Sequence, residues 1–164
     1  MKNNKLFIES PFPELNSKDI ELFEAEYGIS LPDDYKQFLI SHNGGKTGSR
    51  RRFTTNDDTR QGEVESSILV FYPLTNETTE NLEGKYELYT NAGVLKKVFL
   101  PIGETPRSNL VCMGVVDEGN GYIYHIDLGY DDYLDKKLEL EPENIRLIAR
   151  SFTDFINGLF VSES

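Results

Sequence analysis

Residues 110–127, LVCMGVVDEGNGYIYHID, contain the clearest structural signal in this sequence. Two runs rich in β-branched and aromatic residues, 110–116 and 122–127, flank a five-residue link of Asp, Glu, Gly and Asn. Such runs around a short link that contains glycine are typical of a β-hairpin. The pattern therefore predicts two antiparallel strands, with Cys112 and Met113 in a central strand of a sheet.

Further strand signals lie on both sides of this hairpin. Residues 67–72, 98–103 and 145–149 are short apolar runs, and Pro73 ends the first because proline cannot donate to a sheet ladder. Residues 46–66 are polar, basic and without periodicity, which predicts a surface loop. The acidic residues 130–135 are also predicted to form a loop.

The two ends of the chain show helical periodicity instead. Asn16 is placed to cap a helix that Gly28 ends, and Pro32 suits the first position of a second helix. The predicted helices cover residues 16–28, 32–42, 78–91 and 151–160.

Helices and strands without regular βαβ alternation indicate the α+β class. We expect a single domain over residues 1–164, with its core at about 16–160. Two N-terminal helices and a C-terminal helix should pack around an antiparallel-rich sheet.

Charge and composition exclude several classes of partner. The 164 residues have a net charge of −11, and so acidic a surface repels phosphate backbones unless it contains a basic stripe. We therefore expect no direct binding to nucleic acid. The sequence contains neither a signal-peptide pattern nor an apolar run of about 18 residues, which predicts a cytoplasmic protein without membrane contact. Its single cysteine cannot form an internal disulfide.

The charge is unevenly distributed along the chain. Residues 117–143 contain nine acidic residues against Lys136 and Lys137, a net charge of −7. Residues 46–60 have the opposite sign, with a net charge of +3. Such clusters are usually solvated faces, but each is also a candidate contact surface.

The residues with catalytic potential have simpler structural explanations. His42 follows the apolar stripe of a predicted helix, where it can bind the last carbonyl groups or pack its ring. His125 lies within a strand about 6.5–7 Å from Asp127, too far for a direct orienting hydrogen bond. Cys112 lies within an apolar run, whereas reactive cysteines need an electropositive and partly exposed site. We expect no catalytic residue, no metal site and no cofactor.

Four segments, in order, resemble the SUKH superfamily, which includes fungal cell-wall-synthesis regulators and many bacterial immunity proteins. The first is IELFEAEYGISLPDDYKQFLISHNGG at residues 20–45. The others are residues 100–103 (LPIG, similar to a Pro-Ile-Gly turn of the family), 109–127 and 148–156 (IARSFTDFI). Together they extend over about residues 16–160.

The resemblance implies a protein that binds rather than catalyses. Bacterial members are encoded beside secreted polymorphic toxins, often nucleases, which they bind and block. We therefore expect a cytoplasmic immunity protein that neutralises a cognate toxin. The alternative is a regulatory interaction scaffold of the fungal type without a toxin partner. A third hypothesis, from another class, is an enzyme that uses His42 or His125 with a carboxylate.

Two surfaces compete as the contact site for a basic toxin such as a nuclease. The acidic stretch offers both charge and aromatic anchors. Its predicted contact residues are Tyr130, Asp131, Asp132, Tyr133 and Asp135. The competing prediction places the contact on the basic segment, at Arg50, Arg51 and Arg52.

Overall fold

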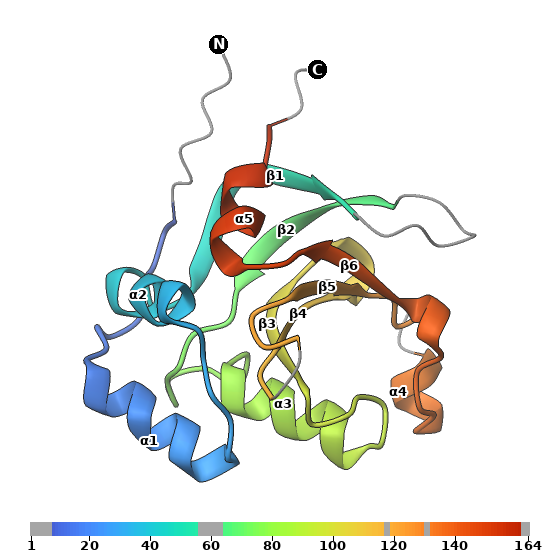
Figure 1. Cartoon of the computed structure of the whole chain (residues 1–164), viewed down its shortest axis with the longest axis horizontal. Helices are drawn as coiled ribbons and strands as arrows, with labels where there is room; N and C mark the ends of the chain where they lie inside the picture. Colours follow the sequence, from blue (N-terminus) through green and yellow to red (C-terminus); the bar gives the residue numbers. More distant parts are fainter. Residues whose placement is uncertain (1–7, 56–63, 117–118, 130–131, 162–164) are drawn as a thin grey trace.

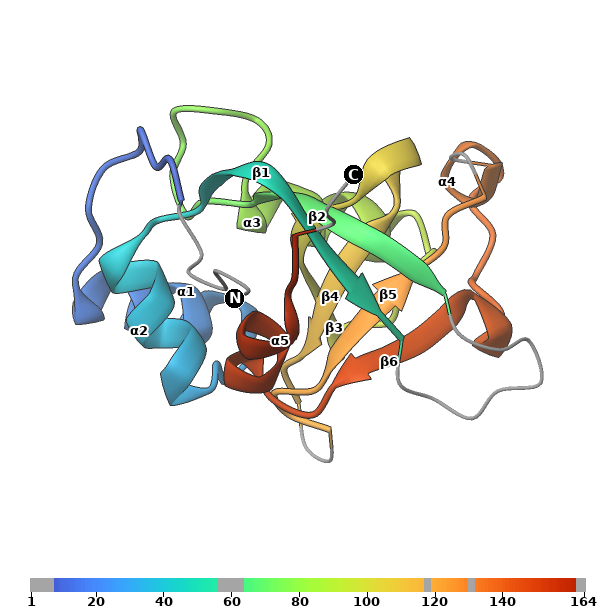
Figure 2. The ribbon, with the colours of Figure 1, turned by 90° about the horizontal axis from the view of Figure 1, so that it is seen from above.

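The computed structural model describes residues 8–55, 64–116, 119–129 and 132–161. In these residues six strands form one sheet in sequence order, and each neighbouring pair is antiparallel (Figure 1). The strands are β1 (Gly45–Thr54), β2 (Glu65–Phe71), β3 (Phe99–Glu104), β4 (Leu110–Gly114), β5 (Ile123–Ile126) and β6 (Ile145–Ala149). The sheet is strongly twisted (Figure 2). The predicted α+β class with an antiparallel sheet is confirmed.

The helices of the described residues flank this sheet. They are α1 (Ser17–Tyr27), α2 (Asp33–Ser41), α3 (Leu82–Asn91), α4 (Asp132–Lys136) and α5 (Phe152–Gly158). α3 packs on β3 and α5 on β6, and α2 contacts both α1 and α5. Figure 1 shows α3 and α5 on opposite sides of the sheet. The two N-terminal helices and the C-terminal helix are therefore present as predicted.

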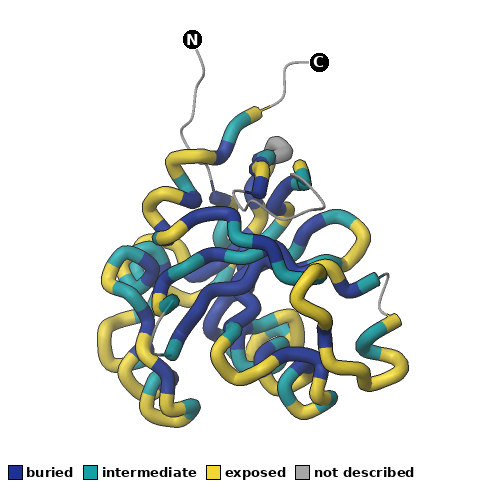
Figure 3. Tube along the Cα trace, turned by 45° about the vertical axis from the view of Figure 1, so that its right-hand side comes forward, coloured by how far each residue is buried: buried dark blue, intermediate teal, exposed yellow. Residues whose placement is uncertain are grey.

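The predicted hairpin forms the centre of the core. β4 lies between β3 and β5, and all five of its residues are buried (Figure 3). Cys112 and Met113 are both fully buried, which confirms that they occupy a central strand. Every residue of β4 thus removes apolar surface from water, the main favourable contribution to folding.

The caps of α1 follow the sequence signals closely. The Asn16 side chain accepts a hydrogen bond from the Asp19 N–H at 3.0 Å, and the Asp19 carboxylate accepts one from the Asn16 N–H at 2.9 Å. This reciprocal pair is a capping box. Gly28 ends the helix with a φ of 64°, a left-handed conformation that glycine adopts without strain. At α2, Pro32 is the N-cap rather than the predicted first helical residue, because its ψ of 151° is extended.

The prediction of a surface loop over residues 46–66 is wrong. Residues 45–54 form the edge strand β1, and β2 begins at Glu65. Thr47, Arg51 and Phe53 are buried along β1, but only Phe53 is large and apolar. The sequence therefore lacks the apolar alternation that reveals a strand. Charged residues are common on edge strands, where they discourage pairing with another chain.

Other element boundaries also differ from the predictions. α3 begins at Leu82 rather than residue 78, because the side chain of Asn81 caps it by accepting from the Gly84 N–H at 2.6 Å. Residues 132–136 form α4 instead of continuing an acidic loop. Residues 100–103 do not form a turn, since β3 continues to Glu104 with an irregular register between Pro101 and Gly103. Proline lacks an N–H donor, and irregular positions are where sheets accommodate it.

Aromatic side chains join the helices to the sheet. The Phe152 ring lies 4.9 Å from that of Phe38 and 6.1 Å from that of Phe71, between ring centroids. Phe152 and Phe155 are buried, whereas Phe38 is only half-buried. The C-terminal helix thus packs its aromatic face fully into the core, while Phe38 of α2 lies at the edge of this cluster.

Candidate functional site

α4 presents part of the acidic stretch that was predicted to bind a partner. Asp132 and Asp135 are exposed, while Tyr133 is half-buried with its side chain packed against the core. Tyr130 and Asp131 lie outside the described residues. The structure thus places two carboxylates in solvent on the same short helix as a partly buried aromatic ring.

A shallow hollow of about 360 Å³ lies beside α4, and we call it the α4 hollow. It is lined by Asp132, Tyr133, Lys136, Leu138, Glu139 and Glu141. Leu138 is 50% exposed, which leaves an apolar surface among charged groups. Glu139 lies 3.9 Å from Lys96, but the two side chains are 64% and 73% exposed, so this ion pair is weak.

The basic segment is less available than the sequence suggested. The Arg51 side chain is buried, opposite Ile68 of β2. Arg52 forms an ion pair in which its Nε donates to the Glu65 carboxylate at 2.9 Å. The side chain of Arg50 lies outside the described part of the chain. β1 therefore uses two of its three consecutive arginines within the fold.

Neither histidine is joined to a carboxylate by a hydrogen bond among the described residues. His42 is an exposed C-cap whose backbone N–H donates to the Phe38 carbonyl at 2.7 Å. His125 is buried beside Phe53, with 6.0 Å between ring centroids, and its Nδ1 has no hydrogen-bond partner in the described structure. Burial lowers the pKa of His125. Neither site has the orienting group that a general base needs.

Other reactive groups are also absent from the described surface. Cys112 is buried, and this burial raises the pKa of its thiol well above the ordinary value, which keeps the thiol protonated and unreactive. No group of three or more His, Cys, Asp or Glu side chains in the described residues could hold a metal ion. None of the described helices has the length and apolar character that crossing a membrane requires.

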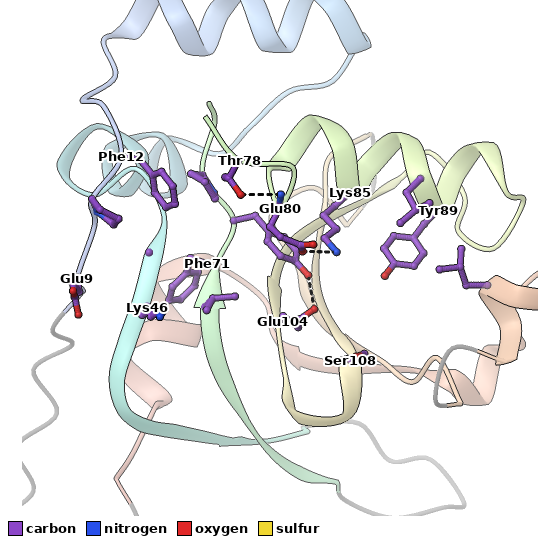
Figure 4. Close-up of a pocket in the computed structure, with 17 residues that line it drawn as sticks. Glu9, Phe12, Lys46, Phe71, Thr78, Glu80, Lys85, Tyr89, Glu104 and Ser108 are labelled. Carbon is purple, nitrogen blue, oxygen red and sulfur yellow. Dashed lines mark hydrogen bonds and ion pairs between the residues drawn. The ribbon is translucent and has the colours of Figure 1, made fainter. Parts of the chain in front are cut away.

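A cavity that the sequence did not predict lies against α3. It has a volume of about 580 Å³, and we call it the α3 cavity (Figure 4). Its walls come from residues 9–12, the start of β1, the end of β2 and one face of α3. Figure 4 shows Phe12 on one side of the cavity and Tyr89 of α3 on the other.

Close backbone approach builds the wall that residues 9–12 provide. Glu9 and Lys46 exchange backbone hydrogen bonds of 2.9 and 3.0 Å, which fix the N-terminal segment against β1. The neighbouring Gly45 has a φ of 123°, and a Cβ atom there would collide with the Glu9 carbonyl group. The missing side chain of Gly45 therefore allows the N-terminal segment to approach β1 this closely.

A chain of polar contacts crosses the α3 cavity. The Lys85 ammonium lies 2.6 Å from the Glu80 carboxylate and 5.4 Å from the centre of the Tyr72 ring. The Tyr72 hydroxyl donates to Glu104 at 3.4 Å, a long hydrogen bond. Burial and the nearby Glu104 carboxylate both raise the pKa of Tyr72, so the phenol stays protonated and remains a donor. The cavity thus combines aromatic walls with fixed charges.

Two consecutive residues at the rim of this cavity adopt a rare backbone conformation. Arg107 has a φ of 68° and Ser108 a φ of 61°, and Ser108 lines the cavity. Left-handed conformations cost free energy in residues other than glycine, and they occur preferentially at functional sites. The cavity thus has a strained backbone segment beside it, a feature that is common at binding sites.

Comparison with known proteins gives two matches. A sequence profile of the SMI1/KNR4 family (SUKH-1) matches residues 14–158. The chain is also similar to the SPbeta prophage-derived uncharacterized protein YokK of Bacillus subtilis (strain 168), with 27% identity over 156 residues. That alignment covers 90% of this chain and 77% of YokK. The profile match includes all four segments on which the family resemblance was based.

Proposed function

The chain belongs to the SMI1/KNR4 family (SUKH-1), and we propose that it is an immunity protein that binds a polymorphic toxin and blocks it. Family membership is the observation on which this proposal depends. The similarity to a prophage-derived protein supports it, because a gene in a mobile element can be inherited together with a neighbouring toxin gene. In this proposal the protein acts in the cytoplasm, by binding and without catalysis.

The α4 hollow is the surface on which we place the toxin. Leu138 and the half-buried Tyr133 offer apolar contact, and the carboxylates of Asp132, Glu139 and Glu141 surround them. An apolar centre inside a charged rim is the usual anatomy of a protein interface. A nuclease toxin with a positively charged cleft would be attracted to this rim over long range.

The competing basic surface has weaker support. Arg51 is buried and Arg52 is paired with Glu65, so a partner would have to compete with contacts inside the fold. A partner would first have to displace the Glu65 carboxylate from Arg52 and draw Arg51 out of its buried position, whereas the exposed carboxylates of α4 need neither change. We therefore assign the contact to the acidic side of the molecule.

The test begins with the gene that lies next to this one. A neighbouring gene that ends in a toxin domain is expected, and the toxin domain should stop growth of a bacterial host when it is expressed alone. Co-expression of this chain should restore growth, and the two proteins should co-purify. If the toxin stays active beside the folded chain, or if no toxin gene accompanies it, a regulatory scaffold becomes the better description.

A further inference from the structure

The α3 cavity contains a carboxylate, that of Glu104, which forms no ion pair with another described residue. Among the described residues, no basic side chain lies within ion-pair distance of Glu104, which accepts only the long hydrogen bond from the Tyr72 hydroxyl. Val70, its cross-strand neighbour on β2, also lines the cavity. Glu104 is therefore held on the cavity wall by two strands of the sheet.

Two lysines, Lys46 and Lys85, line the cavity, and Lys85 shows how a further cation could bind there. Lys85 lies against the Tyr72 ring and is neutralised by Glu80 (Figure 4). Glu104 lies at the hydroxyl end of the same tyrosine, and the five charged residues of the described lining, Glu9, Lys46, Glu80, Lys85 and Glu104, have one more carboxylate than ammonium groups. Cations are attracted both to carboxylates and to the faces of aromatic rings.

The aromatic walls favour arginine over lysine as the ligand. Phe12, Tyr72 and Tyr89 all line the cavity, and Phe12 is the most accessible of the three because Tyr72 and Tyr89 are only 1% and 4% exposed. A guanidinium group is planar, stacks on aromatic rings and can donate two parallel hydrogen bonds to one carboxylate, whereas an ammonium group cannot. The cavity volume of about 580 Å³ lies within the range of about 300–1,000 Å³ that is usual for ligand sites.

The rim of the cavity favours a ligand that is part of a protein. Leu88 of α3 lines the cavity and is 44% exposed, so residues on either side of an inserted arginine would find apolar surface there. Arginine is also among the residues that most often anchor protein interfaces. The net charge of −11 on the whole chain would further attract a basic segment.

We infer that the α3 cavity is a socket for an arginine side chain on a segment of a partner protein. The guanidinium group binds the Glu104 carboxylate, and the apolar stem of the arginine packs on the more accessible part of the lining, at Phe12 and Leu88. This inference rests on the proposed function only in that the partner is a protein, and it does not require the partner to be a toxin.

The test uses the full chain labelled with ¹⁵N and a blocked peptide, acetyl-Leu-Arg-Leu-amide. Titration should shift the backbone amide signals of Phe12, Tyr89 and Glu104. The same peptide with citrulline, a neutral analogue of arginine, should bind at least about fivefold more weakly, and this comparison needs no variant. Free arginine amide should bind more weakly than the peptide, because it lacks the flanking contacts at Leu88.

Two matched variants locate the charge that recognises the peptide. Glu104→Gln keeps an acceptor for the Tyr72 hydroxyl but removes the negative charge. It should lower the affinity for the arginine peptide about tenfold, because a charge-assisted hydrogen bond is lost. The affinity for the citrulline peptide should stay unchanged. Glu87 also accepts a tyrosine hydroxyl, that of Tyr27 at 2.8 Å, but it lies outside the cavity lining. Glu87→Gln should therefore leave both affinities unchanged.

Several results would overturn the inference. They are signal shifts away from the cavity, no binding at all, equal binding of the arginine and citrulline peptides, or binding of free arginine amide as tight as that of the peptide. Each is independent of toxin neutralisation. If the peptide does not bind while a toxin is neutralised, the cavity inference is wrong and the proposed function stands. If the peptide binds as expected while no toxin is neutralised, the cavity inference stands and the proposed function is wrong.

Discussion

The buried side-chain amide of Asn43 pairs with the backbone of Leu74 at both ends. The Leu74 N–H donates to Asn43 Oδ1 at 2.8 Å, and Asn43 Nδ2 donates to the Leu74 carbonyl at 3.1 Å. The same Nδ2 donates to the Pro13 carbonyl at 2.9 Å. Asn43 thus joins the segment before α1, the end of α2 and the segment after β2.

Loss of this amide should destabilise the fold strongly. Asn43→Ala removes three hydrogen bonds and leaves buried backbone groups unpaired, and we expect the free energy of unfolding to fall by about 2–4 kcal/mol in chemical denaturation. Asn157 is exposed near the end of α5, so Asn157→Ala is a suitable control and should cost less than about 0.5 kcal/mol. Similar losses for both variants would show that the Asn43 pairing contributes little.

The aromatic cluster gives a prediction that depends on burial. Phe155 is 1% exposed, and Phe155→Ala should lower the free energy of unfolding by about 3–5 kcal/mol. Phe38 is only half-buried, so Phe38→Ala should cost about half as much, because less apolar surface returns to water. Equal losses in chemical denaturation would contradict this order.

The sequence predicted those parts of the fold whose signals are local. The capping box at Asn16 and Asp19, the stop at Gly28 and the two strands of the hairpin each depend on neighbouring residues, and all are seen as expected. β1 was missed because an edge strand with Thr47 and Arg51 on its buried side has no apolar period. Its pairing with β2 depends on contacts far apart in the sequence.

The two candidate sites also differ in whether the sequence alone could predict them. The acidic residues around α4 could be found from the sequence, because charge is a property of composition. The α3 cavity could not, since it joins residues 9–12, the end of β2, α3 and Glu104. The proximity of Tyr72 and Glu104 follows from the register between β2 and β3, which one sequence does not specify.

The buried His125 should make stability depend on pH. Burial lowers its pKa from the ordinary value of 6.5, although Asp127 opposes the shift and Arg146 adds to it. Below about pH 6.5 the unfolded chain therefore binds a proton that the folded protein binds only at lower pH. Because the unfolded state binds more protons in this window, the free energy of unfolding falls as the pH falls.

Substitution of His125 isolates this contribution. Denaturation of the wild type and His125→Gln between pH 7.5 and 5.5 should show the larger loss of stability in the wild type. His42→Gln, at an exposed position at the end of α2, is the matched control for replacing a histidine by glutamine. If His125→Gln keeps the pH dependence of the wild type, other groups determine it.

The acidic rim of the α4 hollow should control how fast a basic toxin associates. Asp132→Lys with Asp135→Lys reverses two exposed charges, and we expect the association rate to fall at least about tenfold with little change in the thermal midpoint. Glu14→Lys with Glu21→Lys, at exposed positions before and within α1, changes the net charge equally and should have a smaller effect. Stopped-flow measurements with the toxin should also show association slowing with salt once the Debye length falls below about 10 Å. A rate that responds neither to salt nor to the α4 reversals would place the interface away from the α4 hollow.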